Sequence, residues 1–381
     1  MSRRCSFLDL CSARLPARLP SPAVTEALSS ATPSSSCCSA SPAFSSQEAL
    51  TPTTDVQRDV GAPHGHECTA QPPQAGFDMR HLVLLHHLDT HVVGSSSFLS
   101  WTGVNAANLY SEAVFKPAVS APYLMHELLA FSALHLSTQQ VDDAARADYL
   151  QQATALQTRA LALFNAVEHD VREENCMALF AFSSLLGMHT LFDAVASCKD
   201  LGDILDKTIH YLKVHRGVYA ITSRSWQILR QSEIRCIVDA IETGAKLYEQ
   251  QPDDTDNECN RLSSLLRAHS DKLGPGPYRA CQEAVEALHW TFGVRRTVHA
   301  PYSTHVTLAW PVRVTADFAE LLQQRQPIAL VILAHWAVLL HVDREFWIFG
   351  DAGQRLIRAL LTYLGSYWDK WLDLPRSVFH E

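Results

Sequence analysis

The sequence predicts an all-α protein, in which one large multi-helix domain follows a disordered N-terminal segment. Three observations support this. Apolar residues recur three and four positions apart through most of the chain after residue 76. Strand-like alternation is confined to one short candidate, residues 306–314. The chain has 381 residues, of which 47% are hydrophobic and 19% charged, so it can form a substantial core.

Residues 1–76 are rich in Ser, Pro, Ala and Thr, as in SSATPSSSCCSASPAFSS. Few large apolar side chains are present to offset the entropy of ordering, so we expect this segment to be disordered. His64, His66 and Cys68 are metal-ligand types, but no second group of ligands frames them. We interpret them as part of a polar tail and predict no metal and no cofactor.

Helical patterns begin at residue 77 and continue to the end of the chain. Leu82, Leu85 and Leu88 form the first apolar stripe, and Pro122 suits the first turn of the next helix. A long amphipathic helix is predicted over residues 141–168. Further helical patterns cover residues 174–191, 201–219, 226–250, 258–269 and 278–293. We therefore expect a single helical domain over residues 77–381.

Two helices are predicted near the C-terminus. Residues 327–341 are apolar almost all round, so this helix should be central and buried. A second helix should run from Ala352 to about Leu364, with Gly365 at its C-terminal end. Asp351 suits the N-cap position of this second helix, because a carboxylate there can accept hydrogen bonds from exposed backbone N–H groups.

Bulk composition argues against several classes of protein. The formal net charge is −9, and no basic stripe typical of a nucleic-acid-binding domain stands out. The ten cysteines show no paired spacing of a disulfide framework. No membrane span is expected, since the longest apolar run, residues 328–340, is much shorter than the ~20 residues that a spanning helix needs.

Catalytic motifs are mostly absent from the sequence. HELLA at 126–130 lacks the second histidine of a zinc-protease motif, and His87 and His91 lack a third ligand. Neither a G-x-S-x-G elbow nor a G-x-x-x-x-G-K-[ST] loop occurs. An enzyme acting on a lipophilic substrate remains an alternative, with candidate acid–base groups at His126, His189, His289 and His335.

The stretch WIFGDAGQRLI places Gly350 and Gly353 between an aromatic pair and a new helix. It lacks the third glycine and the lysine of a phosphate cradle, so close packing or a ligand-facing loop are the remaining explanations. Large aromatic and flexible side chains in and around this segment could line an apolar pocket. The predicted ligand-binding residues are Met125, Met188, Trp290, Trp336, Trp347, Phe349, Gly350 and Gly353.

An ordered set of stretches carries a family resemblance. These are LMHELLAFSALHLS (124–137), REENCMALFAFSSLLGMHTL (172–191), IHYLKVHRGVYAI (209–221), PIALVILAHWAVLLHVDREFWIFGDAGQRLI (327–357) and YWDKWLDLP (367–375). Together they resemble the C-terminal regulatory domain of fungal zinc-cluster transcription factors, especially those similar to the sterol uptake control protein. The resemblance covers residues 80–374. It implies an all-helical, nuclear regulatory domain that binds a hydrophobic, sterol-like effector near the Gly350–Gly353 loop.

The N-terminal segment departs from this family. Family members carry a six-cysteine zinc cluster with C-x2-C spacings, which Cys5, Cys11, Cys37, Cys38 and Cys68 do not provide. We therefore expect contact with DNA only indirectly, through a transcription factor or co-regulator, unless a DNA-binding segment is encoded upstream of Met1. A helical interaction module that binds no small molecule is a further alternative. The pathway, whether sterol, lipid or secondary metabolite, and a homodimeric state stay open.

Overall fold

The computed structural model describes residues 79–93, 110–167, 170–196, 201–250, 257–299 and 302–380, and every regular element in these ranges is helical. The predicted all-α class is therefore confirmed. The disordered segment predicted at 1–76, with its His64, His66 and Cys68, lies outside the described residues.

The α-helices are α3 (Met79–His87), α5 (Lys116–Ser120), α6 (Pro122–Gln139), α7 (Asp143–Asn165), α8 (Cys176–Ala196), α9 (Leu201–Gln231), α10 (Arg235–Gln250), α11 (Asn257–Ala268), α12 (Ser270–Leu273), α13 (Pro275–Thr297), α14 (Ser303–Arg313), α15 (Ala316–Gln323), α16 (Pro327–Val342), α17 (Ala352–Leu364) and α18 (Asp373–Ser377). Shorter π- and 3-10-helical segments are η1 (Leu88–Val93), η3 (Ser111–Phe115) and η5 (Ser366–Trp371).

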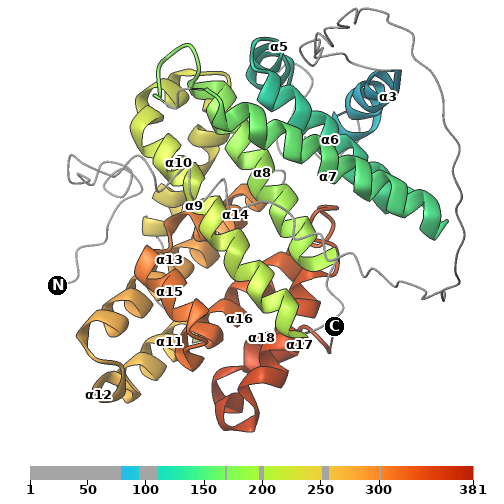
Figure 1. Cartoon of the computed structure of the whole chain (residues 1–381). Coiled ribbons are helices and arrows are strands. Elements are labelled where there is room, and N and C mark those ends of the chain that lie inside the picture. Colours follow the sequence, from blue (N-terminus) through green and yellow to red (C-terminus); the bar gives the residue numbers. More distant parts are fainter. Residues whose placement is uncertain are drawn as a thin grey trace, which may run out of the picture.

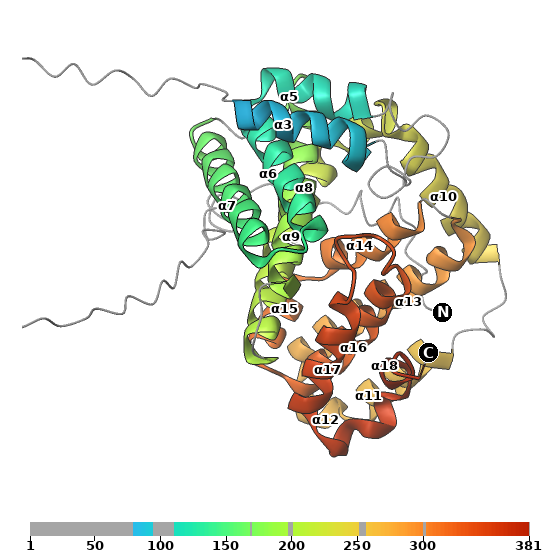
Figure 2. The same cartoon turned by 90° about the vertical axis from the view of Figure 1, so that its right-hand side faces the viewer.

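Long helix pairs organise the molecule. Helices α6 and α7 pack along each other, as do α8 and α9, and α16 packs against α17 (Figure 1). Helix α16 lies among the C-terminal helices (Figure 2), and its side chains from Ile328 to His341 are all buried. One hydrophobic cluster joins residues from Leu84 in α3 to Val378 after α18, so both halves of the chain share a core.

Several helix boundaries follow directly from local sequence. Pro122 and Pro327 occupy the first turns of α6 and α16, where their missing N–H groups cost nothing. Gly365 ends α17 with a positive φ of 68°. Asp351 stands at the N-cap of α17, but its side chain makes no capping hydrogen bond, which corrects that part of the prediction.

Two predicted elements differ from the structure. The short strand candidate at residues 306–314 is a helix in the structure, because α14 covers most of this stretch and buries Val306, Leu308 and Trp310. The expected break between 219 and 226 is also wrong, because α9 continues without interruption to Gln231. In both places packing against neighbouring helices overrides the local sequence pattern.

One described helix has the length and composition of a membrane span, which the sequence analysis did not identify. It covers Cys176–Val195 of α8, with a mean hydropathy of 1.4, and 83% of its most apolar window is buried inside the protein. Burial of this kind is typical of a core helix, since packing against α6 and α9 already covers its apolar surface.

Candidate functional site

The loop between α16 and α17 is fixed to the protein at its start. Asp343 is only 8% exposed and accepts two hydrogen bonds from the Arg295 guanidinium, at 2.6 and 3.2 Å. The Thr307 hydroxyl donates a third hydrogen bond to Asp343, at 2.6 Å. A buried carboxylate with three donors from α13 and α14 holds the loop entrance in one position.

The two glycines of this loop have different structural roles. Gly350 has a φ of 42°, a backbone conformation that side-chain-bearing residues rarely adopt. Gly353 lies against α16: a Cβ atom there would come within 2.5 Å of the His341 nitrogen and 2.6 Å of the Ala337 oxygen. Gly353 therefore permits close approach of α17 to α16, which is the packing alternative of the sequence analysis.

Trp347 connects this loop to α6 and α8. Its ring lies 5.1 Å from Phe131, 4.9 Å from His135 and 5.8 Å from Phe192, measured between ring centroids. The side chain is only partly buried, yet its Nε1–H is sealed from water and has no hydrogen-bond partner among the described residues. An indole donor without an acceptor is available to a ligand that enters this contact.

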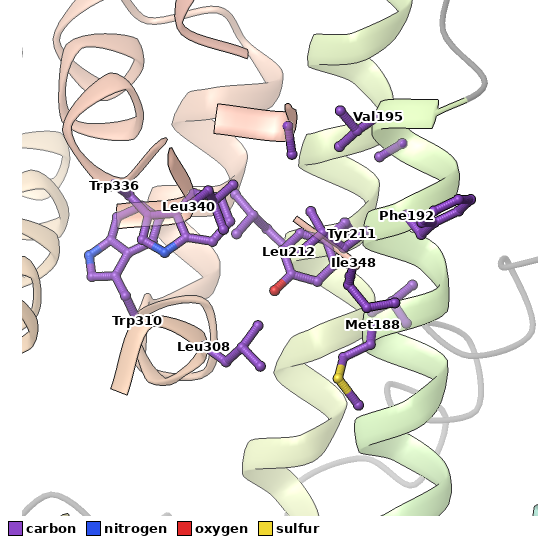
Figure 3. Packing of buried hydrophobic residues seen from close by; sticks show 14 of the residues in the cluster. Met188, Phe192, Val195, Tyr211, Leu212, Leu308, Trp310, Trp336, Leu340 and Ile348 are labelled. Atoms are coloured by element: carbon purple, nitrogen blue, oxygen red, sulfur yellow. The ribbon is translucent and has the colours of Figure 1, made fainter. Parts of the chain in front are cut away.

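The loop residues beside Trp347 point into the core. Ile348 and Phe349 are 2% and 1% exposed. Figure 3 shows Ile348 reaching between α8 and α9, next to Met188, Phe192 and Tyr211. The loop therefore acts as an apolar plug that fills the space between the α8–α9 pair and the C-terminal helices.

The predicted ligand-binding residues do not all meet at this plug. Met188 lies on the α8 side of the cluster, whereas Trp336 lies on the opposite side, stacked on Trp310 at 5.4 Å (Figure 3). Met125 is buried in α6 and belongs to the same large core cluster. Trp290 belongs to a separate, smaller cluster and has the Arg313 guanidinium 4.0 Å above its ring. Trp347, Phe349, Gly350 and Gly353 thus share one loop region, and the other four are distributed around it.

An open cleft of about 880 Å³ lies at the N-terminal end of α8 and the C-terminal end of α9. It is formed by η3, α5, the start of α6, the turn before α8 and the C-terminal end of α9. These elements gather near α5, at the top of Figure 1. The lining side chains that carry charge are Glu112, Lys116, Glu173, Glu174 and Glu233. Sequence reasoning missed this cleft because four separate stretches of the chain contribute to it, residues 112–123, 167, 173–179 and 227–233.

The four histidines of the enzyme alternative lie on four different helices and none lines the cleft. His335 is buried, with Nδ1 2.8 Å from the Val331 carbonyl, and burial lowers its pKa to about 4. His189 is 3.1 Å from the buried Glu127. Burial acts to lower its pKa, but Asp193 and Glu127 raise it overall. This arrangement is a buried ion pair between α6 and α8 and contains no nucleophile.

Metal-binding geometry is equally limited in the described part of the chain. Within those residues, no group of three or more His, Cys, Asp or Glu side chains could hold a metal ion. His87 and His91 stack at 4.9 Å between ring centroids, and His87 Nε2 lies 2.9 Å from His135 Nδ1. His87, His91 and His135 therefore form a cluster of imidazole rings beside Trp347, which we call the ring cluster.

Comparison with known proteins identifies a relationship to transcription factors. Residues 83–237 match the model of the fungal specific transcription factor domain. The chain is 28% identical over 325 residues to a Zn(2)-C6 fungal-type transcription factor of Gibberella zeae, covering 80% of this chain and 62% of the relative. It is 25% identical over 230 residues to the Zn(2)-C6 fungal-type transcription factor afumD of Aspergillus fumigatus, covering 57% of this chain and 56% of that protein. The chain thus spans about six tenths of the length of these relatives. All residues that line the cleft lie within the matched range 83–237.

Proposed function

We propose that this protein is a nuclear transcriptional regulator that acts through its helical domain, which binds a DNA-bound transcription factor or a co-regulator. The match of residues 83–237 to the fungal specific transcription factor domain is the observation that carries this proposal. Two relatives named as fungal-type transcription factors support it. In this proposal the helical domain contacts DNA indirectly, through that partner.

We further propose that the plug around Trp347 responds to a hydrophobic effector of sterol-like character, from a lipid or secondary-metabolite pathway. Trp347 joins α6 and α8, which lie in the matched range, to the C-terminal α16–α17 pair. An apolar ligand with one acceptor oxygen would pair with the free Nε1–H and displace the ring contacts. Such a ligand would shift the domain between two states by the difference in its affinity for them.

The regulatory part is tested by fusing the full chain to an unrelated DNA-binding domain upstream of a reporter gene. We expect reporter expression to change, upward for an activator and downward for a repressor. Light scattering on the purified chain establishes whether it is a monomer or a homodimer. A fusion that is folded and nuclear but leaves expression unchanged would contradict the proposal.

The effector part is tested by titrating the full chain with a fluorescent sterol. Trp347→Ala should weaken binding about tenfold, since buried aromatic contacts and a hydrogen bond are both lost. Trp371→Ala is the matched control, because Trp371 is also partly buried but lies in η5 and outside the plug. Absence of saturable binding would remove the sterol-like effector while leaving the regulatory proposal intact.

A further inference from the structure

We propose that the acidic cleft binds an arginine- and leucine-rich segment of the same chain, residues 3–18 (RRCSFLDLCSARLPAR). This inference goes beyond the proposed function, because it concerns a contact within the chain and not its effect on genes. It depends on the charge of the cleft, on its floor and on the composition of the segment.

The cleft carries a net negative charge, because most of its carboxylates have no cationic partner among the described residues. Among its charged lining residues, Lys116 is the single cation, and its Nζ is already 2.9 Å from Glu112. Glu173, Glu174 and Glu233 have no salt-bridge partner among the described residues. The hydrogen bond from Lys116 to Glu112 raises the lysine pKa, and Glu233 adds to this effect. Three free carboxylates around one opening attract cations and repel nucleic-acid phosphates.

The floor of the cleft provides apolar contacts and one unpaired hydroxyl. Met177, Ile228 and Pro117 line it together with Tyr123, which is only 7% exposed. The Tyr123 ring packs edge-on against Phe164 and Phe182, at 5.5 and 5.2 Å. Its hydroxyl has no hydrogen-bond partner among the described residues. The cleft therefore suits a ligand that combines basic groups with apolar side chains and a backbone or side-chain hydrogen-bonding group.

Cys176 on the cleft floor lies close to two of the cleft carboxylates. Its thiol is fully buried and donates to the Glu173 carbonyl at 3.5 Å. Burial raises the pKa of this thiol, and the charges of Glu173 and Glu233 raise it further. Cys176 therefore stays a neutral thiol, and the cleft is a binding surface rather than a nucleophilic site.

Residues 3–18 match this surface in composition. The segment contains Arg3, Arg4, Arg14 and Arg18 with one acid, Asp9. The following residues 19–78 are opposite in character: their cationic side chain is Arg58, against the acids Glu26, Glu48, Asp55, Asp59, Glu67 and Asp78. Arginine suits carboxylates because its planar guanidinium forms paired hydrogen bonds, and Phe7 and Leu15 supply apolar groups for the floor.

Chain length does not prevent the contact. Residues 19–78 separate the segment from α3, and sixty residues can span up to roughly 200 Å when extended. A segment on the same chain also has an effective concentration far above that of a separate partner. This advantage favours the chain's own segment over a basic peptide of similar composition from another protein.

The test uses photo-crosslinking of the full-length chain with p-benzoylphenylalanine in place of Phe7. After irradiation, mass spectrometry should find adducts on residues 112–123, 173–179 or 227–233, which line the cleft. Mixing isotopically light and heavy chains distinguishes contact within a chain from contact between chains. The same photo-reactive residue in place of Phe44, which has no neighbouring arginine, is the matched probe and should give few cleft adducts.

The charge dependence is tested with Glu173→Gln/Glu174→Gln/Glu233→Gln, which should reduce cleft adducts about fivefold, as should raising the salt concentration. Glu286→Gln/Glu320→Gln/Glu345→Gln changes the net charge equally on exposed positions outside the cleft and should leave the adducts unchanged. Circular dichroism confirms that each variant is folded. Adducts mainly elsewhere, adducts between chains, or adducts insensitive to the cleft substitutions would each overturn the proposal.

Discussion

The α16–α17 loop and the acidic cleft differ in how their residues reach one another. The loop is built from neighbours in sequence, with Phe346, Ile348 and Phe349 all buried. The cleft is built from segments more than a hundred residues apart, from Glu112 to Glu233. The loop stabilises the fold through packing and a buried ion pair, whereas the cleft leaves charges unpaired. The loop that stabilises the fold and the cleft proposed to bind a ligand are thus separate regions of this protein, and substitutions in each can test that separation.

The largest effect is expected at the entrance of the loop. Asp343→Ala should lower the free energy of unfolding by about 3–5 kcal/mol, because Arg295 and Thr307 lose their shared buried acceptor. Chemical denaturation of the purified chain measures this. Asp351→Ala is the matched control at the other end of the loop and should change stability by less than about 0.5 kcal/mol, since Asp351 is exposed and makes no cap hydrogen bond. Equal effects would show that Asp343 does not hold the loop.

The ring cluster beside Trp347 should make the protein sensitive to acid. Burial and neighbouring histidines lower the pKa of His87 to about 4, and burial also lowers that of His135. The unfolded chain, with histidine pKa values near 6.5, binds more protons than the folded chain between pH 6.5 and 4. Stability should therefore fall as the pH drops through this window, by at most about 1.4 kcal/mol per pH unit for each group.

Thermal unfolding at several pH values measures this dependence. His87→Gln should flatten the slope between pH 6.5 and 4. His126→Gln is a weaker perturbation of the same type, because His126 is half-buried on α6, outside the ring cluster, with its Nδ1 2.8 Å from the Pro122 carbonyl of its own helix. An unchanged slope in the His87 variant would mean that other groups cause the acid sensitivity.

The glycines of the loop separate packing from backbone strain. Gly353→Ala should cost about 1–3 kcal/mol, because its Cβ would contact backbone atoms of α16 that cannot move aside. Gly350→Ala should cost about 1 kcal/mol through its φ of 42°, since the new methyl group would meet the Trp347 carbonyl oxygen at an ordinary contact distance of 3.9 Å. Differential scanning calorimetry would rank the two. The reverse order would contradict close packing of α17 on α16.

Much of the loop region was predictable from sequence because its determinants are local. The run of apolar residues in 327–341 predicts a buried helix, and α16 is one. Gly365 ends α17 as predicted, because a positive φ is a local requirement. The stretch 306–314 was a strand candidate in the sequence and is helical in the structure, because nine residues with mixed β-branched and apolar side chains do not distinguish a strand from a helix whose buried face is set by tertiary contacts.

The candidate sites were less predictable than the fold. Trp290 and Trp336 were predicted to line a pocket with the loop because they are large aromatic residues. In the structure they pack elsewhere: the Arg313 guanidinium lies over the Trp290 ring, and Trp336 stacks on Trp310. Aromatic content therefore indicates a core and does not show which side chains share a cavity. The cleft has no local signature, since Glu112, Glu173 and Glu233 resemble ordinary surface acids until the helices bring them together.

The smallest effect on stability is expected in the cleft, and this is where the two regions differ most. Glu173→Gln/Glu174→Gln/Glu233→Gln should change the free energy of unfolding by less than about 0.5 kcal/mol, or raise it slightly, because three like charges without partners are neutralised. Chemical denaturation at low and high salt measures this, and the stabilisation should disappear at high salt. Loss of several kcal/mol would mean that these carboxylates hold the fold together, as Asp343 does. A recognition surface is expected to tolerate the substitutions, because its unpaired carboxylates make no stabilising ion pair within the folded chain alone.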